Sequence, residues 1–118
     1  MDDWEKAGKI AANALEFGEG LIKKNISLME ITKKIEERII KDGGGFGFPV
    51  NISINHVAAH YTADPENDFK FKENDVVKLD VGVHVNGAVG DNALTVDLGS
   101  NKELLEASRK ALENAIRV

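Results

Sequence analysis

Cysteine is absent from the 118 residues, and no apolar run approaches the roughly 20 residues that a membrane-spanning helix needs. The lack of cysteine excludes a disulfide scaffold, a zinc–thiolate site and a thiol nucleophile. Basic residues are also few, because 15 Lys and Arg stand against 20 Asp and Glu for a net charge of −5. A nucleic-acid module normally needs a basic face, so that class is disfavoured. The N-terminal residues lead straight into a helical pattern without the features of a signal peptide. We therefore expect an acidic, soluble, cytoplasmic domain with no membrane or nucleic-acid partner.

A chain of this length can bury one sizeable core, so residues 1–118 are expected to form a single domain. Apolar and small side chains recur at helical spacing over residues 4–24, which predicts an amphipathic helix. A second helix is expected from Ser27, because Ser27 and Glu30 have the spacing of a capping box. The glycines at 43–45 end this helix, since glycine readily takes the left-handed conformation beyond a helix terminus.

The middle of the chain changes character, because its apolar period drops toward two and Val, Ile, Thr and Asn become frequent. Three strands are expected, over residues 48–54, 76–85 and 88–98. Residues 62–74 are polar and predict a surface loop. Ser100 and Glu103 repeat the capping-box spacing and predict a third helix. These elements indicate an α+β fold in which helices cover one face of an antiparallel sheet built around a central hairpin.

The hairpin turn is predicted at Asn86-Gly87, because a type I′ turn needs positive φ at both of its central positions. A two-residue turn pairs Gly82 with Asp91, and it leaves Asp80 as the diagonal neighbour of Asp91 on the same face of the sheet. The Cα atoms of the two aspartates are then expected about 7 Å apart. Gly82, which has no side chain, is expected to leave room above the sheet there. The opposite face is apolar and should pack against the helices.

Two aspartates on one sheet face repel each other unless a cation or a shared proton lies between them. A divalent metal ion, or a pair of ions, would explain Asp80 and Asp91, and such hard ligands suit Mn, Mg, Co, Zn or Fe(II). The alternative is that both are solvated surface residues, and a slipped register or a bulge would separate them. His84 shares their face but lies about 13 Å along the strand from Asp80, too far to bind the same ion, so we interpret it as structural.

His60 is the second candidate for chemistry. It ends an apolar stretch and precedes a loop, where an imidazole can donate a hydrogen bond to a substrate carbonyl. The alternative interpretation is a buried histidine whose hydrogen bonds are satisfied within the fold.

Two segments carry a resemblance to a known family. Residues 47–62 read GFPVNISINHVAAHYT, and residues 77–96 read VKLDVGVHVNGAVGDNALTV. Both resemble the archaeal and eukaryotic (type 2) methionine aminopeptidases, and the resemblance extends over essentially all 118 residues. It implies one half of the pita-bread fold that is shared with prolidase and creatinase. It also implies removal of the initiator methionine from nascent polypeptides whose second residue is small.

The resemblance assigns roles to four residues. Asp80 and Asp91 match two of the five ligands, two Asp, one His and two Glu, that hold two divalent ions (Co, Mn, Fe(II) or Zn), with Asp91 bridging both ions and Asp80 chelating one. His60 matches a histidine that contacts the substrate, and Phe48 matches a residue that lines the pocket for the methionine side chain.

The remaining ligands, the His and both Glu, have no counterpart in this sequence. We therefore expect residues 1–118 to be the N-terminal half of the catalytic domain, with weak or no metal binding and no aminopeptidase activity by itself. The apolar face that would contact the absent half is expected to be exposed and to allow self-association. Two alternatives remain open, a non-catalytic pita-bread relative that binds protein or RNA, and a metallohydrolase of the prolidase type.

Overall fold

The computed structural model describes residues 2–117 except residues 56–69. Three helices and three strands follow one another in the order ααβββα. The helices are α1 (Asp3–Leu21), α2 (Leu28–Lys41) and α3 (Lys102–Ile116). The strands are β1 (Gly45–Ile54), β2 (Val76–Val85) and β3 (Ala88–Asp97). The predicted α+β class is confirmed, and each expected helix and strand is present with ends shifted by a few residues.

The helix starts follow capping chemistry at two of the three positions. The Oδ1 atom of Asp2 accepts a hydrogen bond from the backbone N–H of Glu5 at 2.8 Å and caps α1. The Oγ atom of Ser27 accepts from the N–H of Glu30 at 3.2 Å, so the predicted cap of α2 is confirmed. Each of these bonds satisfies one of the backbone donors that a helix start leaves without an intrahelical partner.

The predicted cap of α3 is wrong. Asn101, not Ser100, is the N-cap residue, and its side chain makes no capping bond. The turn is instead held by Asp97, whose Oδ2 accepts from the N–H of Asn101 at 2.8 Å and whose Oδ1 accepts from the N–H of Gly99 at 2.9 Å. The N–H of Ser100 donates to the Asn74 side chain at 3.2 Å. A carboxylate upstream therefore organises this turn in place of the serine.

The sheet is antiparallel, with β2 in the centre between β1 and β3. The β2–β3 pairing runs without a break from Val85↔Ala88 to Val76↔Asp97. Asn86 and Gly87 have φ values of 50° and 86°, the positive pair that a type I′ turn requires. The predicted hairpin and its register are both confirmed.

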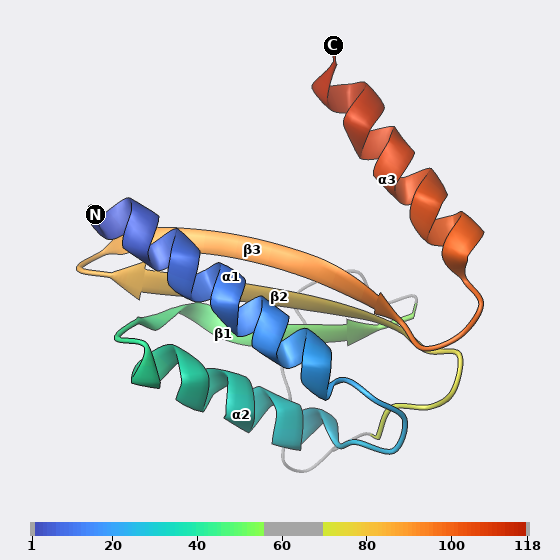
Figure 1. Ribbon diagram of the computed structural model, residues 1–118, viewed down its shortest axis with the longest axis horizontal. Helices are drawn as coiled ribbons and strands as arrows, with labels where there is room; N and C mark the ends of the chain where they lie inside the picture. The colour runs from blue at the N-terminus through green and yellow to red at the C-terminus, as the bar shows by residue number, and fades with distance from the viewer. Residues whose placement is uncertain (1, 56–69, 118) are drawn as a thin grey trace.

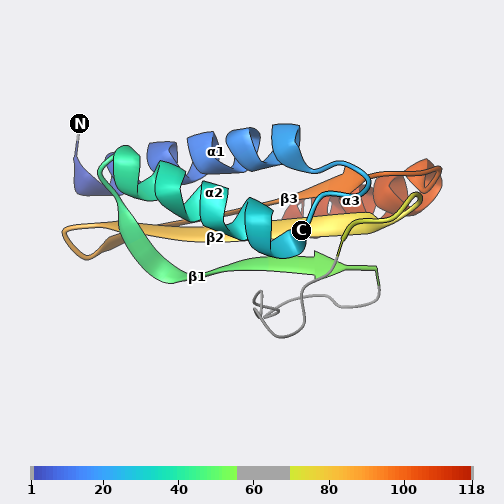
Figure 2. The same cartoon turned by 90° about the horizontal axis from the view of Figure 1, so that it is seen from below.

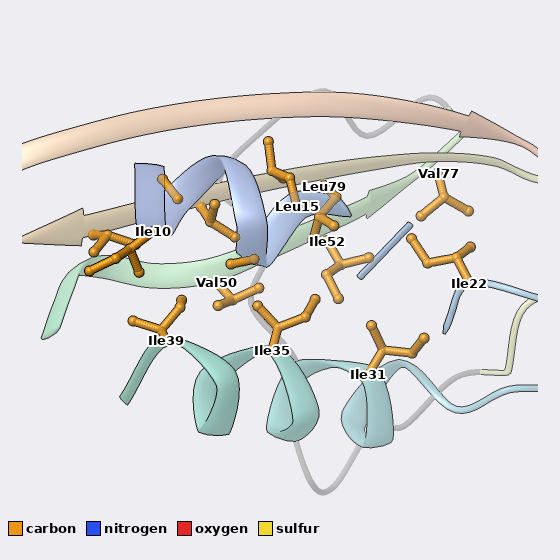
Figure 3. Close-up of a cluster of buried hydrophobic side chains, with 14 of the residues drawn as sticks. Ile10, Leu15, Ile22, Ile31, Ile35, Ile39, Val50, Ile52, Val77 and Leu79 are labelled. Carbon is orange, nitrogen blue, oxygen red and sulfur yellow. The ribbon is translucent and has the colours of Figure 1, made fainter. Parts of the chain in front are cut away.

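Helices α1 and α2 lie side by side on one face of the sheet (Figures 1 and 2). Between the helices and the sheet lies the hydrophobic core, to which α1 contributes Ile10 and Leu15 (Figure 3). The helix α1 approaches β3 closely at Gly90, where the nearest atoms belong to the backbone of Ala7 and Gly8. Nearby, the Asn92 side chain donates to the carbonyl of Gly8 at 3.5 Å. The covered face is therefore the one the alternation predicted.

The segment before β2 is not entirely a surface loop, because Phe71 is buried. The predicted surface loop, residues 62–74, lies largely outside the described residues, but Phe71 within it is fully buried in the core. Its N–H donates to the carbonyl of Ile26 at 3.0 Å, and its carbonyl accepts from the N–H of Asn25 at 2.8 Å. Phe71 thus fastens the connection before β2 to the turn between α1 and α2.

Helix α3 runs away from the sheet after β3 (Figure 1). None of its described residues is buried, and its large apolar side chains Leu104, Leu112 and Ile116 are 67%, 62% and 74% exposed. Among the described helices, none has the length and apolar character to cross a membrane.

Candidate functional site

The two aspartates occupy the sheet face opposite to α1 and α2. Asp91 of β3 is directly opposite Gly82 of β2, and Asp80 lies two residues from Gly82 along β2. Cross-strand partners share a face, as do residues two apart on a strand, so Asp80 and Asp91 are diagonal neighbours on one face. The intervening Val81 points the other way and is fully buried in the core. The predicted geometric relation between the two residues is thus present.

The two carboxylates differ in their access to solvent. Asp91 is exposed, whereas Asp80 is half-buried and its Oδ1 atom is itself buried. Within the part of the chain that the structure describes, no group of three or more His, Cys, Asp or Glu side chains gathers as a metal site. The described residues thus offer two hard oxygen ligands, one shielded and one open, rather than a closed ligand set.

The neighbouring strand β1 adds two more residues to this face, because its pairing with β2 is irregular. Phe48 is opposite Gly82 and Asn51 is opposite Asp80, so three steps along β1 span two steps along β2. In regular pairing, residues three apart face opposite sides, whereas one extra residue lets both share a face. The bulge therefore places Phe48 and the buried Asn51 beside the aspartates.

The space above Gly82 is filled, contrary to expectation. A Cβ on Gly82 would overlap the Cδ2, Cε2 and Cζ atoms of the Phe48 ring, so the ring lies directly over this glycine. The absence of a side chain on Gly82 does create room there, but an aromatic ring of the neighbouring strand occupies it. The ring thus borders the diagonal between Asp80 and Asp91.

The other sequence candidates have different outcomes. His60 lies outside the described residues. His84 is exposed at the far end of β2, and its ring covers Gly45, where a Cβ would overlap the imidazole. Lys78 shares the face of Asp80, and its ammonium group donates to the carbonyl of Asn55, while partial burial lowers its pKa.

Asn51 is the residue of this face that the sequence did not single out. Its only signal was Pro49, since proline within a strand often marks a bulge or an edge.

Residues 2–118 match the model of Metallopeptidase family M24. The chain belongs to this family. The methionine aminopeptidase of Pyrococcus abyssi is 45% identical over 119 residues, which cover all of this chain and 40% of that protein. This M24 chain therefore spans less than half the length of that relative.

Two solved structures show the same fold as this M24 chain. The methionine aminopeptidase of Thermotoga maritima superposes with a TM-score of 0.82 at 29% identity, over 97% of this chain and 50% of that one. The prolidase of Pyrococcus furiosus superposes with a TM-score of 0.75 at 26% identity, over 82% of this chain and 29% of that one. The predicted pita-bread architecture is confirmed by these neighbours.

The donor set of this M24 chain suits a divalent metal. Carboxylate oxygens are ligands that Mn²⁺, Mg²⁺ and similar hard ions prefer, and the side chains of Asp80 and Asp91 start from adjacent strands on one face. A pair of carboxylates satisfies only part of such an ion's coordination shell, so further ligands are required for a tight site.

Proposed function

We propose that this chain forms part of a divalent-metal aminopeptidase that removes the N-terminal methionine of nascent polypeptides whose second residue is small. The observation that carries the proposal is the diagonal placement of Asp80 and Asp91 on the sheet face that the helices leave open. Membership in family M24 and similarity to proteins named methionine aminopeptidase support it. The cytoplasm is the compartment consistent with this role and with a chain free of cysteine.

Each residue has a distinct part in the proposed site. Asp80 and Asp91 would hold the divalent metal ions as carboxylate ligands. Such ions polarise a peptide carbonyl and activate water for its hydrolysis. The Phe48 ring, beside the carboxylates, offers an apolar wall to the methionine side chain of the substrate. His60 donates a hydrogen bond to the substrate.

The two aspartates supply only part of the proposed ligand set. A His and two Glu from the remaining length of the enzyme are expected to complete it, since the matched segment is 40% of the Pyrococcus abyssi relative. We propose that residues 1–118 are the N-terminal half of the catalytic domain, and that the same remaining part covers the exposed apolar face of α3. Residues 1–118 alone are then inactive and bind metal weakly.

A chimera tests the proposed activity. This chain replaces the matching segment of the Pyrococcus abyssi enzyme, and release of methionine from a Met-Ala-Ser peptide is measured with Mn²⁺ or Co²⁺. We expect activity in the chimera and none in residues 1–118 alone. Asp80→Asn and Asp91→Asn should each lower kcat/KM by more than about a hundredfold, because even residues that merely support metal ligands cost 10- to 100-fold. Thr95→Ala, an exposed change on the same face, is the matched control.

The same assay separates the second candidate, a prolidase-type hydrolase, which the structural match to a prolidase favours. A prolidase-type hydrolase would cleave a dipeptide with proline in second position and would release little methionine from Met-Ala-Ser. Enzyme-like release of methionine by residues 1–118 alone would contradict the proposed division of the ligand set. Sedimentation velocity tests whether the α3 face also drives self-association, and a monomer at high concentration would exclude it.

A further inference from the structure

We propose that Gly82 is a positioning residue of the metal site, because its missing side chain is the seat that holds the Phe48 ring against Asp80 and Asp91. This inference rests on the proposed function for the identity of the metal ligands. It concerns a residue that has no side chain and so supplies no side-chain ligand. Gly82 acts through Phe48, so it touches neither metal nor substrate.

The three-strand register supports the inference. Phe48, Gly82 and Asp91 form one cross-strand row, and Asp80 lies in the next row along β2. Gly82 is therefore the only residue of the row between the Phe48 side chain and Asp91, as well as the same-face neighbour of Asp80 along the strand. Any side chain there would separate the ring from both carboxylates.

The close fit of the ring over Gly82 supports it further. A Cβ at this position would overlap three ring atoms, far inside ordinary van der Waals contact. Gly82 is buried and Phe48 is half-buried, so the ring and not solvent covers the glycine. On the adjacent bulged segment of β1, a Cβ added to Gly47 would meet its nearest atoms at 3.2–3.5 Å, which is much less severe. Gly82 is thus the position on this face where the added methyl group must move the ring.

The placement has a chemical consequence for the metal site. The ring covers Gly82 on one side of the diagonal between half-buried Asp80 and exposed Asp91. A ring displaced by the Gly82→Ala substitution would leave this side open to solvent. It would also retreat from the place where the apolar end of a substrate is expected.

Solution NMR of the chain with ring-labelled phenylalanine tests the proposal, with Mn²⁺ alone as the probe. Paramagnetic broadening reports proximity to the ion and does not require activity or tight binding. In the unmodified chain we expect Mn²⁺ to broaden both the Phe48 ring signal and the backbone amide of Asp91. In Gly82→Ala the Asp91 amide should still broaden, whereas the broadening of the Phe48 ring at the same Mn²⁺ concentration should fall several-fold, because the effect decreases with the sixth power of the distance. Gly20→Ala, which meets no atom within 4 Å, is the control and should retain both effects.

The outcomes separate this inference from the proposed function. Equal broadening of the Phe48 ring in the Gly82→Ala variant and the unmodified chain would overturn the positioning role. Broadening at Asp91 that survives Asp91→Asn together with Asp80→Asn would instead overturn the metal site. Should Gly82→Ala not fold, the double variant Gly82→Ala/Phe48→Ala supplies the second measurement. A folded double variant supports the proposed seat, because removal of the ring relieves the overlap, and an unfolded one contradicts it.

Discussion

Gly90→Ala should loosen the contact that holds β3, the strand of Asp91, against α1. A Cβ on Gly90 would approach the backbone of Ala7 and Gly8 to 2.7 Å, whereas ordinary contact begins at 3.4 Å. The helix would have to retreat by about 0.7 Å, and backbone cannot rotate away as a side chain can. Overpacking of this kind typically costs about 1–3 kcal/mol in the free energy of unfolding.

Equilibrium unfolding in urea, followed by circular dichroism, measures this cost. With a denaturant slope of about 1–3 kcal/mol per molar for a small protein, the midpoint should fall by about 1 M. Gly8→Ala is the matched control, since it lies on the other side of the same contact and its Cβ would meet no atom within 4 Å. That change should stabilise the protein by about 0.5–1 kcal/mol, because alanine is the better helix former. A Gly90→Ala variant as stable as the unmodified chain would refute the close-approach argument.

Three further predictions concern other parts of the fold. Phe71→Ala should lower the free energy of unfolding by about 3–5 kcal/mol, as for other fully buried phenylalanines, and urea unfolding with a midpoint loss under a few tenths of a molar would contradict this burial. Ser27→Ala should cost about 1 kcal/mol in the same assay, whereas Ser100→Ala should cost almost nothing, because only Ser27 makes a capping bond; equal losses would show the cap assignment to be wrong. The pKa of Asp97 is lowered from 3.8, first by the hydrogen bond from the Asn101 side chain and then by the hydrogen bond from the Gly99 backbone. The stability that ionised Asp97 gives to the turn before α3 is therefore present above pH 3.8, and it is lost as the pH falls through the lower pKa of the folded state. A carboxyl-carbon NMR titration should show this lowered midpoint, and an ordinary one would remove the proposed role of Asp97.

The hairpin could be read from the sequence because its determinants are local. The Asn86-Gly87 turn fixes the register by itself, and the alternation of apolar residues fixes which face is buried. The relative placement of Asp80 and Asp91 depends only on these two features. Their roles as ligands rest on the resemblance to the aminopeptidases and stay a prediction.

The features that could not be predicted from the sequence depend on contacts between distant segments. The bulge in β1 sets where Phe48 lies, but it depends on how that strand pairs with β2 and leaves only Pro49 as a trace. Phe71 is a single aromatic residue in a polar stretch, and a single residue forms no periodic pattern from which its burial could be predicted. The start of α3 depends on the turn after β3, where Asp97 accepts hydrogen bonds from the N–H groups of Gly99 and Asn101, and the capping-box spacing of Ser100 and Glu103 does not reveal this turn.

The two-residue turn of the hairpin limits how this segment can change in evolution. Inserting or deleting one residue within β3 between the turn and Asp91 would turn every side chain beyond it to the other face, burying Asp91 under α1 and exposing its apolar neighbours. A change by two residues would keep the faces but slide Asp91 away from Asp80 along the strand. Length changes inside the two strands are therefore poorly tolerated, and the spacing of eleven positions between the aspartates behaves as a fixed dimension of the protein.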